Sequence, residues 1–294
     1  MVRNSKKAVR DRVVEVYAPC VFTRSNLLAR GVSGRSITRA VEAGALLRLR
    51  RDRYAYPDIA AEVAEAVRIG GRLSCLSLLV AIGIFVHRAS GLHVQLAPDA
   101  SRVRPPGSAR TRLHWSAPSS VPAPLHAAAF EDVVRHAIRC QTPRGALATL
   151  DSLLHHRLLT RRQLATIFDG LPQRYARLLS LVDATAESGP ETFMRLILKA
   201  IGAEYETQVR IEGVGRVDFV IEGWLIIECD SREFHEGWLA QVEDRRRDLA
   251  AAARGYVTIR PLATDVMERP DIVRGAVIDV MAALGMRGGR GRRS

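Results

Sequence analysis

The segment from Leu225 to Asp230 constrains the fold more than any other part of the chain. Its sequence, Leu-Ile-Ile-Glu-Cys-Asp, is apolar until acidic residues interrupt it. Successive side chains of a strand point to opposite faces, so Glu228 and Asp230 lie on the same face. Two carboxylates beside buried apolar side chains cost too much free energy unless a cation compensates them. The segment therefore predicts a buried strand, over residues 224–230, whose carboxylates hold a cation.

The strand expected just before it, over residues 217–221, carries a third carboxylate, Asp218. A two-residue loop between the strands would pair Asp218 with Ile227 and point it to the wrong face. A three-residue loop that includes Trp224 would instead pair Asp218 with Glu228. Because the carboxylates must converge to share a cation, we expect the longer loop or a bulge.

Helices and further strands are expected on both sides of this hairpin. The sequence Ser188-Gly189-Pro190-Glu191 has the form of a capping box and predicts a helix that begins there and continues to Ala200. The pattern as a whole is typical of an α/β fold with a mixed sheet. The other expected elements are strands over 206–211 and 256–260 and helices over 238–253 and 272–284.

The charge distribution separates this acidic block from the rest of the chain. Residues 1–57 hold 13 basic and 4 acidic side chains, and residues 58–186 hold 15 and 9. Residues 187–285 hold 12 and 18, and the Gly- and Arg-rich tail 286–294, which we expect to be disordered, adds 4 basic side chains. A net charge of +9 on the first 57 residues indicates a polyanionic partner, because each neutralised phosphate releases counterions. A basic surface that only aids solubility is the alternative interpretation.

The first 57 residues predict a winged helix-turn-helix domain. Three short helices are expected over 5–16, 24–29 and 35–43, and a basic hairpin over 46–56. In this fold the third helix enters the DNA major groove and the hairpin contacts the backbone, although winged helices also serve as protein-docking modules. The residues expected to contact DNA are Arg35, Ser36 and Arg39 on the third helix and Arg48, Arg50, Arg51 and Arg53 in the hairpin.

The same segment resembles a known family of regulators. The sequence Ile37-Thr38-Arg39-Ala40-Val41-Glu42-Ala43-Gly44, followed by Leu47-Arg48-Leu49-Arg50-Arg51 and Arg53-Tyr54-Ala55, is similar to the N-terminal domain of AbiEi-type antitoxins of abortive-infection systems. The resemblance covers residues 22–57. It implies DNA binding, and it does not imply a toxin partner.

Residues 58–186 predict an α+β linking domain in which the sequence indicates no chemistry. Helices are expected over 60–69, 73–86, 130–139, 145–156 and 160–168, and strands over 92–97 and 112–116. The four cysteines, Cys20, Cys75, Cys140 and Cys229, form no Cys-x-x-Cys pair. We therefore expect reduced, buried thiols and neither a disulfide framework nor a structural zinc site.

No segment of the sequence predicts a membrane association. The longest apolar run, residues 73–86, is 14 residues long and too short to span a bilayer. The N-terminus lacks an apolar signal segment with a small-residue cleavage site. These features predict a cytoplasmic protein.

Five motifs follow one another in residues 187–265. They are Ser188-Gly189-Pro190-Glu191, Arg216-Val217-Asp218-Phe219, Ile227-Glu228-Cys229-Asp230 with His235 five residues on, Asp244-Arg245-Arg246-Arg247-Asp248 and Gly255-Tyr256-Val257-Thr258-Ile259-Arg260. In these motifs the segment resembles the PD-(D/E)XK nuclease superfamily, in particular the small bacterial endonuclease domains related to very-short-patch-repair enzymes. The resemblance implies a restriction-endonuclease-like sheet flanked by helices and a magnesium- or manganese-dependent endonuclease.

The resemblance also implies a role for individual residues. Asp218 and Glu228 correspond to the metal-binding acids, with the backbone carbonyl of Cys229 completing the shell and Glu191 joining it directly or through water. Asp230 stands where the superfamily signature has lysine, as it does in the related small domains. The remaining expected roles are His235 as general base or acid, Arg245 and Arg247 as phosphate ligands, and Asp244 and Asp248 as the residues that orient them.

Simpler interpretations stay open for several of these residues. Glu191 can be a capping residue only, His235 a hydrogen-bonded histidine near a strand end, and residues 244–248 a solvated helix face. Two functions follow from the sequence. The first is a metal-dependent endonuclease that its winged helix delivers to double-stranded DNA, with RNA as an alternative substrate. The second is a DNA-binding regulator or AbiEi-like antitoxin, with a cognate toxin as partner, whose nuclease fold is inactive; a homodimer is compatible with both.

Overall fold

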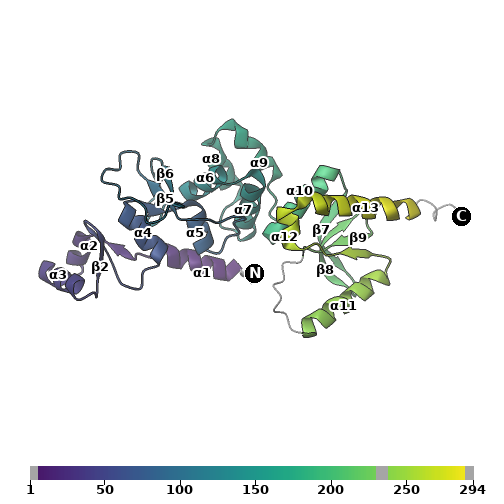
Figure 1. The fold of residues 1–294 in the computed structure, drawn as a ribbon, viewed down its shortest axis with the longest axis horizontal. Coiled ribbons are helices and arrows are strands. Elements are labelled where there is room, and N and C mark those ends of the chain that lie inside the picture. Colours follow the sequence, from purple (N-terminus) through teal and green to yellow (C-terminus); the bar gives the residue numbers. More distant parts are fainter. Residues whose placement is uncertain (1–5, 230–237, 289–294) are drawn as a thin grey trace. The chain divides into compact units, whose positions relative to one another are not determined.

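The computed structural model describes residues 6–229 and 238–288, and it is built from helices and small mixed sheets (Figure 1). The chain divides into two compact units. One contains residues 4–149 and 156–181, and the other contains residues 150–155 and the chain from 182 onward. The first unit thus contains most of the segments 1–57 and 58–186 that we expected as separate domains, and the boundary at 182 lies close to the expected start of the acidic block.

Three helices and a three-stranded antiparallel sheet begin the first unit, much as predicted. Thr23 forms a capping box with Asn26, and Ser33 caps the third helix by accepting a hydrogen bond from the Ser36 amide. Phe22, Leu27, Ile37, Leu46 and Tyr54 form a common core. The elements are α1 (Lys6–Tyr17), β1 (Val21–Phe22), α2 (Arg24–Ala29), α3 (Gly34–Glu42), β2 (Leu47–Arg50) and β3 (Arg53–Ala55), with strand order β1-β3-β2.

The rest of the first unit holds a second three-stranded sheet and several helices. Its strand order is β4-β5-β6, with β4 antiparallel and β6 parallel to the central strand. The elements are α4 (Ala61–Ile69), β4 (Arg72–Leu73), α5 (Cys75–Ala81), β5 (His93–Leu96), β6 (Arg112–Trp115), α6 (Phe130–Cys140), α7 (Pro143–His155), whose residues 150–155 belong to the other unit, α8 (Arg161–Asp169), a 3-10 turn (Gln173–Tyr175) and α9 (Ala176–Leu181).

The prediction of one helix over residues 73–86 is wrong at both ends. Leu73 pairs with Val94 in the sheet, so the chain is extended there, and α5 begins only at Cys75. The helix ends early because Gly83 adopts a left-handed conformation with φ 81°. Its amide and that of Ile84 bond back to the carbonyls of Val80 and Leu79, which is the Schellman ending of a helix.

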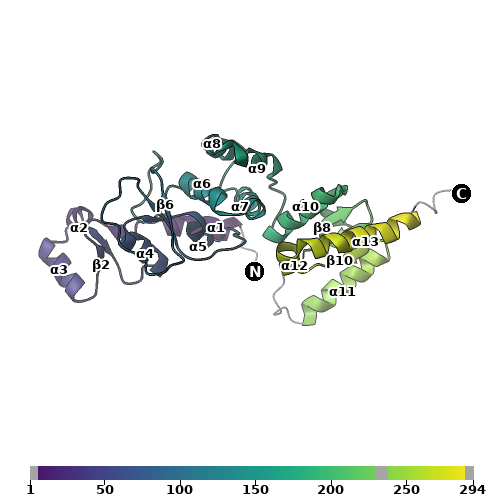
Figure 2. The same ribbon diagram turned by 45° about the horizontal axis from the view of Figure 1, so that its top comes forward.

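The second unit is a four-stranded mixed sheet with helices on both sides (Figure 2). Its strand order is β10-β9-β8-β7, with β10 parallel to β9 and the other pairs antiparallel. In Figures 1 and 2, α10, α12 and α13 lie together on one side of the sheet and α11 lies on the other. The elements are α10 (Gly189–Ile201), β7 (Tyr205–Ile211), β8 (Gly215–Ile221), β9 (Leu225–Ile227), α11 (Trp238–Ala252), β10 (Val257–Ile259), α12 (Ala263–Glu268) and α13 (Pro270–Gly288).

Two features of this unit differ from the prediction. Residues 263–268 form a helix that was not expected, and the last helix continues to Gly288, into the segment predicted as a disordered tail. Residues 289–294 lie outside the described part of the chain.

A buried ion pair fixes the helix that opens this unit. The Arg195 guanidinium of α10 donates to Asp151 Oδ2 over 2.7 Å, and both side chains are 1% exposed. The Thr192 hydroxyl and the Asp183 amide also donate to the Asp151 carboxylate. Because each oxygen of the buried carboxylate has a donor, this network sets the position of α10 firmly.

Among residues 6–229 and 238–288, no helix has the length and apolar character needed to cross a membrane.

Candidate functional site

The hairpin of β8 and β9 brings Asp218 close to Glu228. Its paired residues run from Ile221 and Leu225 to Phe219 and Ile227, so Asp218 and Glu228 are the next residues along the two segments, and the charge of Asp218 acts on the Glu228 carboxyl. The loop has three residues, 222–224, as predicted. Glu222 and Gly223 both have positive φ, at 49° and 75°, which is the requirement of a type I′ turn, and Trp224 supplies the extra residue.

Asp218 is linked to Glu191 through the amide of Gln208. Asp218 Oδ2 accepts a hydrogen bond from the Cys229 amide at 3.0 Å, and Oδ1 accepts one from Gln208 Nε2 at 3.4 Å. The same Gln208 nitrogen donates to Glu191 Oε2 at 2.8 Å. One amide group therefore contacts two carboxylates that come from a strand and from a helix.

Glu191 is more than a capping residue. Ser188 caps α10 by accepting from the Glu191 amide, as expected, and the Glu191 carboxylate also accepts from the Glu187 amide and from Gln208. Glu191 is 4% exposed. Burial, together with the nearby charge of Asp218, raises the pKa of Glu191 from 4.5 to about 7. A buried carboxyl beside a second carboxylate is typical of sites that bind a cation or exchange a proton.

Gln208 is a site residue that the sequence analysis missed. It has φ 55° inside β7, and the pairing of β7 with β8 is interrupted between Thr207 and Val209. This left-handed conformation is costly for a residue with a side chain, and such strain gathers at functional sites. Gln208 Oε1 is buried and has no hydrogen-bond partner within the described ranges. The only sequence signal is an amide residue ten positions before Asp218 in the preceding strand.

Two arginines hold Glu228. Arg247 Nη2 donates to Glu228 Oε1 at 3.0 Å, and Arg260 Nη1 donates to Oε2 at 2.6 Å. Burial raises the pKa of Glu228, and the charges of Arg260 and Arg247 oppose that effect without cancelling it. Arg260, which the sequence did not single out as a site residue, is itself held by Asp248 at 2.7 Å.

The arginines predicted to bind phosphate have different surroundings. Arg247 of α11 also donates to the carbonyl oxygens of Val214 and Arg216, so it ties the helix to the sheet as well as to Glu228. Arg245 lies exposed on the same helix. Asp244 lies 3.8 Å from Arg247, whereas Asp248 orients Arg260 and not Arg247. Two other predicted site residues, Asp230 and His235, lie outside the described part of the chain.

The basic residues predicted in the N-terminal segment lie largely on the surface. Arg35, Ser36 and Arg39 are exposed on α3, on the side opposite the buried Ile37. In the β2–β3 hairpin, Arg48 and Arg51 are exposed, whereas Arg50 and Arg53 are half-buried.

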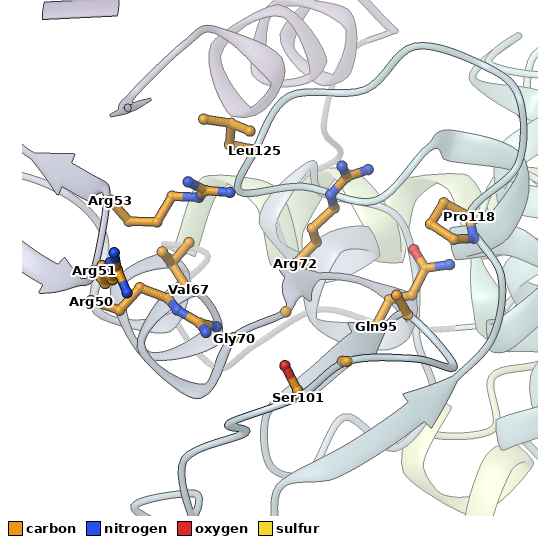
Figure 3. A pocket seen from close by; sticks show the side chains of 13 residues that line it. Arg50, Arg51, Arg53, Val67, Gly70, Arg72, Gln95, Ser101, Pro118 and Leu125 are labelled. Carbon is orange, nitrogen blue, oxygen red and sulfur yellow. The ribbon is translucent and has the colours of Figure 1, made fainter. Parts of the chain in front are cut away.

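Arg50 and Arg53 line a basic pocket of about 350 Å³ together with Arg72 of β4 and Gln95 of β5. Figure 3 shows Arg53 and Arg72 approaching the pocket from different elements. Burial lowers the pKa of Arg50 and of Arg72, and in both cases the charge of Arg53 lowers it further. Clustered guanidinium groups that destabilise one another in this way favour binding of an anion, because an anion relieves the repulsion.

The middle segment, for which the sequence indicated no chemistry, contains a cluster of metal-ligating side chains. Cys75, His93, His114 and Cys140 place their ligand atoms within 4.8 Å of one another, and both cysteines are free thiols. A search of the sequence for closely spaced ligand pairs such as Cys-x-x-Cys does not find this cluster. These four are brought together only by the packing of four separate elements.

The chain matches no model of a known protein family, and a search of curated proteins gives no match either.

Proposed function

We propose that the protein is a divalent-metal-dependent endonuclease that binds double-stranded DNA through its basic N-terminal segment. The observation that carries the proposal is the convergence of Asp218, Glu191 and Glu228 at one end of the β8–β9 hairpin. The order of a helix, three antiparallel strands, a helix and a parallel strand supports a restriction-endonuclease-like fold for the second unit.

The donor set suits Mg²⁺ or Mn²⁺. All of its members are oxygen ligands, which hard divalent cations prefer. The raised pKa of Glu191 and the unpartnered Gln208 Oε1, within the described ranges, both indicate a polar site that a bound cation with its waters would complete. Asp218, Glu228 and the Cys229 carbonyl would hold the ion, with Glu191 direct or through water. Such an ion polarises the scissile phosphate and lowers the pKa of an attacking water.

The residues of the chain then have separate tasks. Gln208 sets the distance between Asp218 and Glu191, because its amide donates to both. Arg247 and Arg260 orient Glu228 and place positive charge where a phosphate would lie. Burial of Glu191 and partial burial of Asp218 and Glu228 strengthen their attraction for a cation.

The first unit supplies affinity for DNA in this proposal. The order of α1, β1, α2, α3 and the β2–β3 hairpin supports a winged helix-turn-helix. Its third helix exposes Arg35 and Arg39, which suit the guanine edges of the major groove. The arginine pocket beside the hairpin suits a backbone phosphate.

One observation favours the alternative, a DNA-binding regulator with an inactive nuclease fold. Both oxygens of Glu228 already accept hydrogen bonds from arginines, so a cation must displace or share these donors. If the two ion pairs are too stable to open, the unit keeps its fold and binds no metal at Glu228.

Cleavage of supercoiled plasmid tests the proposal against this alternative. We expect nicking in Mg²⁺ or Mn²⁺, none in EDTA, and loss of nicking in Glu228→Ala. Glu206→Ala, which removes an exposed glutamate of the same unit, is the matched control and keeps the activity. Absence of cleavage, with a salt-sensitive gel shift that Glu228→Ala retains, would contradict the proposal and support the regulator. A parallel reaction with duplex RNA determines which sugar the substrate carries.

A further inference from the structure

We propose that Cys75, His93, His114 and Cys140 bind one zinc ion, independently of the nuclease site. The four side chains come from separate elements of the first unit. Cys75 is the first residue of α5, and Cys140 is the last residue of α6. His93 lies in β5 and His114 in β6.

The distances between ligand atoms match a tetrahedral zinc site. With Zn–S bonds of about 2.3 Å and Zn–N bonds of about 2.0 Å, a tetrahedron has edges of about 3.6 Å between sulfur and nitrogen and about 3.3 Å between nitrogens. His93 Nδ1 lies 3.2 Å from His114 Nε2. Cys140 Sγ lies 3.6 Å from His114 Nε2 and 3.9 Å from His93 Nδ1. The three edges agree with the expected values to within a few tenths of an ångström.

The sheet explains why the two imidazoles meet. β5 and β6 are parallel, with His93 opposite Arg112 and Gln95 opposite His114. His93 and His114 therefore lie two positions apart in register and on the same face of the sheet. Their rings stack with centroids 5.4 Å apart, and each presents a nitrogen to the same point.

The two thiols complete the arrangement from the helices. Cys75 is fully buried and has φ 52°, a left-handed conformation that costs free energy in a residue with a side chain. The conformation lies where the chain turns from β4 into α5. A bound metal would offset this cost, because the conformation directs the Cys75 thiol into the cluster.

Neighbouring side chains contact the proposed zinc ligands and fix their orientation. The His114 ring stacks on His136 with centroids 4.5 Å apart. His136 is fixed in turn by the hydroxyls of Ser74 and Ser116, at 3.1 Å and 2.9 Å. Arg112 donates to Cys140 Sγ at 3.8 Å, which stabilises a thiolate. Such partners orient ligands and tune their affinity for the metal.

Zinc suits this donor set better than magnesium, which we propose for the carboxylate site. Two thiolates and two imidazoles are soft and borderline ligands, which bind zinc and not magnesium. All four positions of the tetrahedron are taken by protein atoms, and no open position is left for substrate. We therefore assign a structural role, in which zinc fastens α5 and α6 to the β5–β6 pair.

The metal content of the purified full-length protein tests the assignment. We expect one zinc ion per chain by elemental analysis after dialysis, and loss of that zinc in Cys75→Ala/Cys140→Ala. Cys20→Ala removes a free cysteine away from the cluster and is the matched control, which keeps its zinc. Zinc that the double variant retains would overturn the assignment.

Cobalt substitution gives a second test that does not depend on the folding of a variant. Chelator-treated wild-type protein is titrated with Co²⁺ and its absorption is measured. We expect the ligand-field bands of tetrahedral cobalt and a thiolate charge-transfer band, both removed by one equivalent of Zn²⁺. An octahedral spectrum without charge transfer, in a protein purified without zinc, would overturn the assignment.

Discussion

Substitution of Glu191 by glutamine should change how the stability of the second unit depends on pH. In the absence of metal, burial and the charge of Asp218 raise the pKa of Glu191 from 4.5 to about 7. Between pH 4.5 and pH 7, Glu191 is therefore protonated to a greater extent in the folded chain than in the unfolded chain. Stability from this group is fully present below pH 4.5 and is lost as the pH rises towards 7.

The size of this effect follows from the same values. A tenfold change in proton affinity corresponds to about 1.4 kcal/mol, so the group accounts for about 3 kcal/mol between pH 4.5 and pH 8. Glutamine does not titrate, so Glu191→Gln gains about this much stability relative to wild type across the interval. The gain is largest at pH 8, where wild type keeps a buried carboxylate beside Asp218.

Urea unfolding in EDTA, followed by tryptophan fluorescence, measures the difference. Trp115, which is 53% exposed, is first replaced by phenylalanine, so that the signal comes from Trp224 and Trp238 of the second unit. Glu206→Gln controls for the loss of one negative charge. If the free energies of unfolding of wild type and Glu191→Gln vary in parallel with pH, the raised pKa of the buried Glu191 carboxyl is refuted.

Three further predictions follow from single contacts. Asp151→Ala removes the nearer of the two carboxylates that face the buried Arg195 and leaves Asp183 at 3.9 Å, so it should lower the free energy of unfolding by about 3 kcal/mol in urea titration, and a loss below about 1 kcal/mol would contradict the pair's role. Arg39→Ala should weaken binding to a preferred DNA site by about 1–3 kcal/mol and relax its specificity in gel-shift titrations, whereas equal weakening on all sequences would argue against base contact. Arg72→Ala should weaken binding to all duplexes alike and reduce the salt slope by about one, and an unchanged slope would exclude a phosphate contact in the pocket.

The sequence predicts local structure well where one pattern determines it. The helices expected over 24–29 and 35–43 begin directly after Thr23 and Ser33, whose hydroxyls cap them, and such a local contact needs no distant partner. Strand register and the need to join carboxylates excluded a two-residue loop and left a three-residue loop or a bulge, and the structure has the three-residue loop. Residues 73–86 were mispredicted, because sheet pairing of Leu73 overrides the helical pattern of the apolar run.

The candidate sites were predictable only in part. Asp218 and Glu228 stand out in the sequence because acidic residues are rare next to buried apolar strand positions, and Glu191 stands out through its capping-box motif. Gln208 does not, since its role arises from a strained backbone that places its amide between two carboxylates. The Cys and His residues of the proposed zinc site include no closely spaced pair such as Cys-x-x-Cys, and only the packing of α5, α6, β5 and β6 unites them.

Binding of Mn²⁺ tests most directly whether the carboxylates form one metal site. The ion is titrated into zinc-loaded protein, and free Mn²⁺ is measured by electron paramagnetic resonance. We expect one bound ion in wild type and none at the same concentration in Asp218→Asn, whose amide oxygen can still accept from the Cys229 amide and keep the hairpin intact. Equal binding by the two proteins, or binding by neither, would contradict the proposed site.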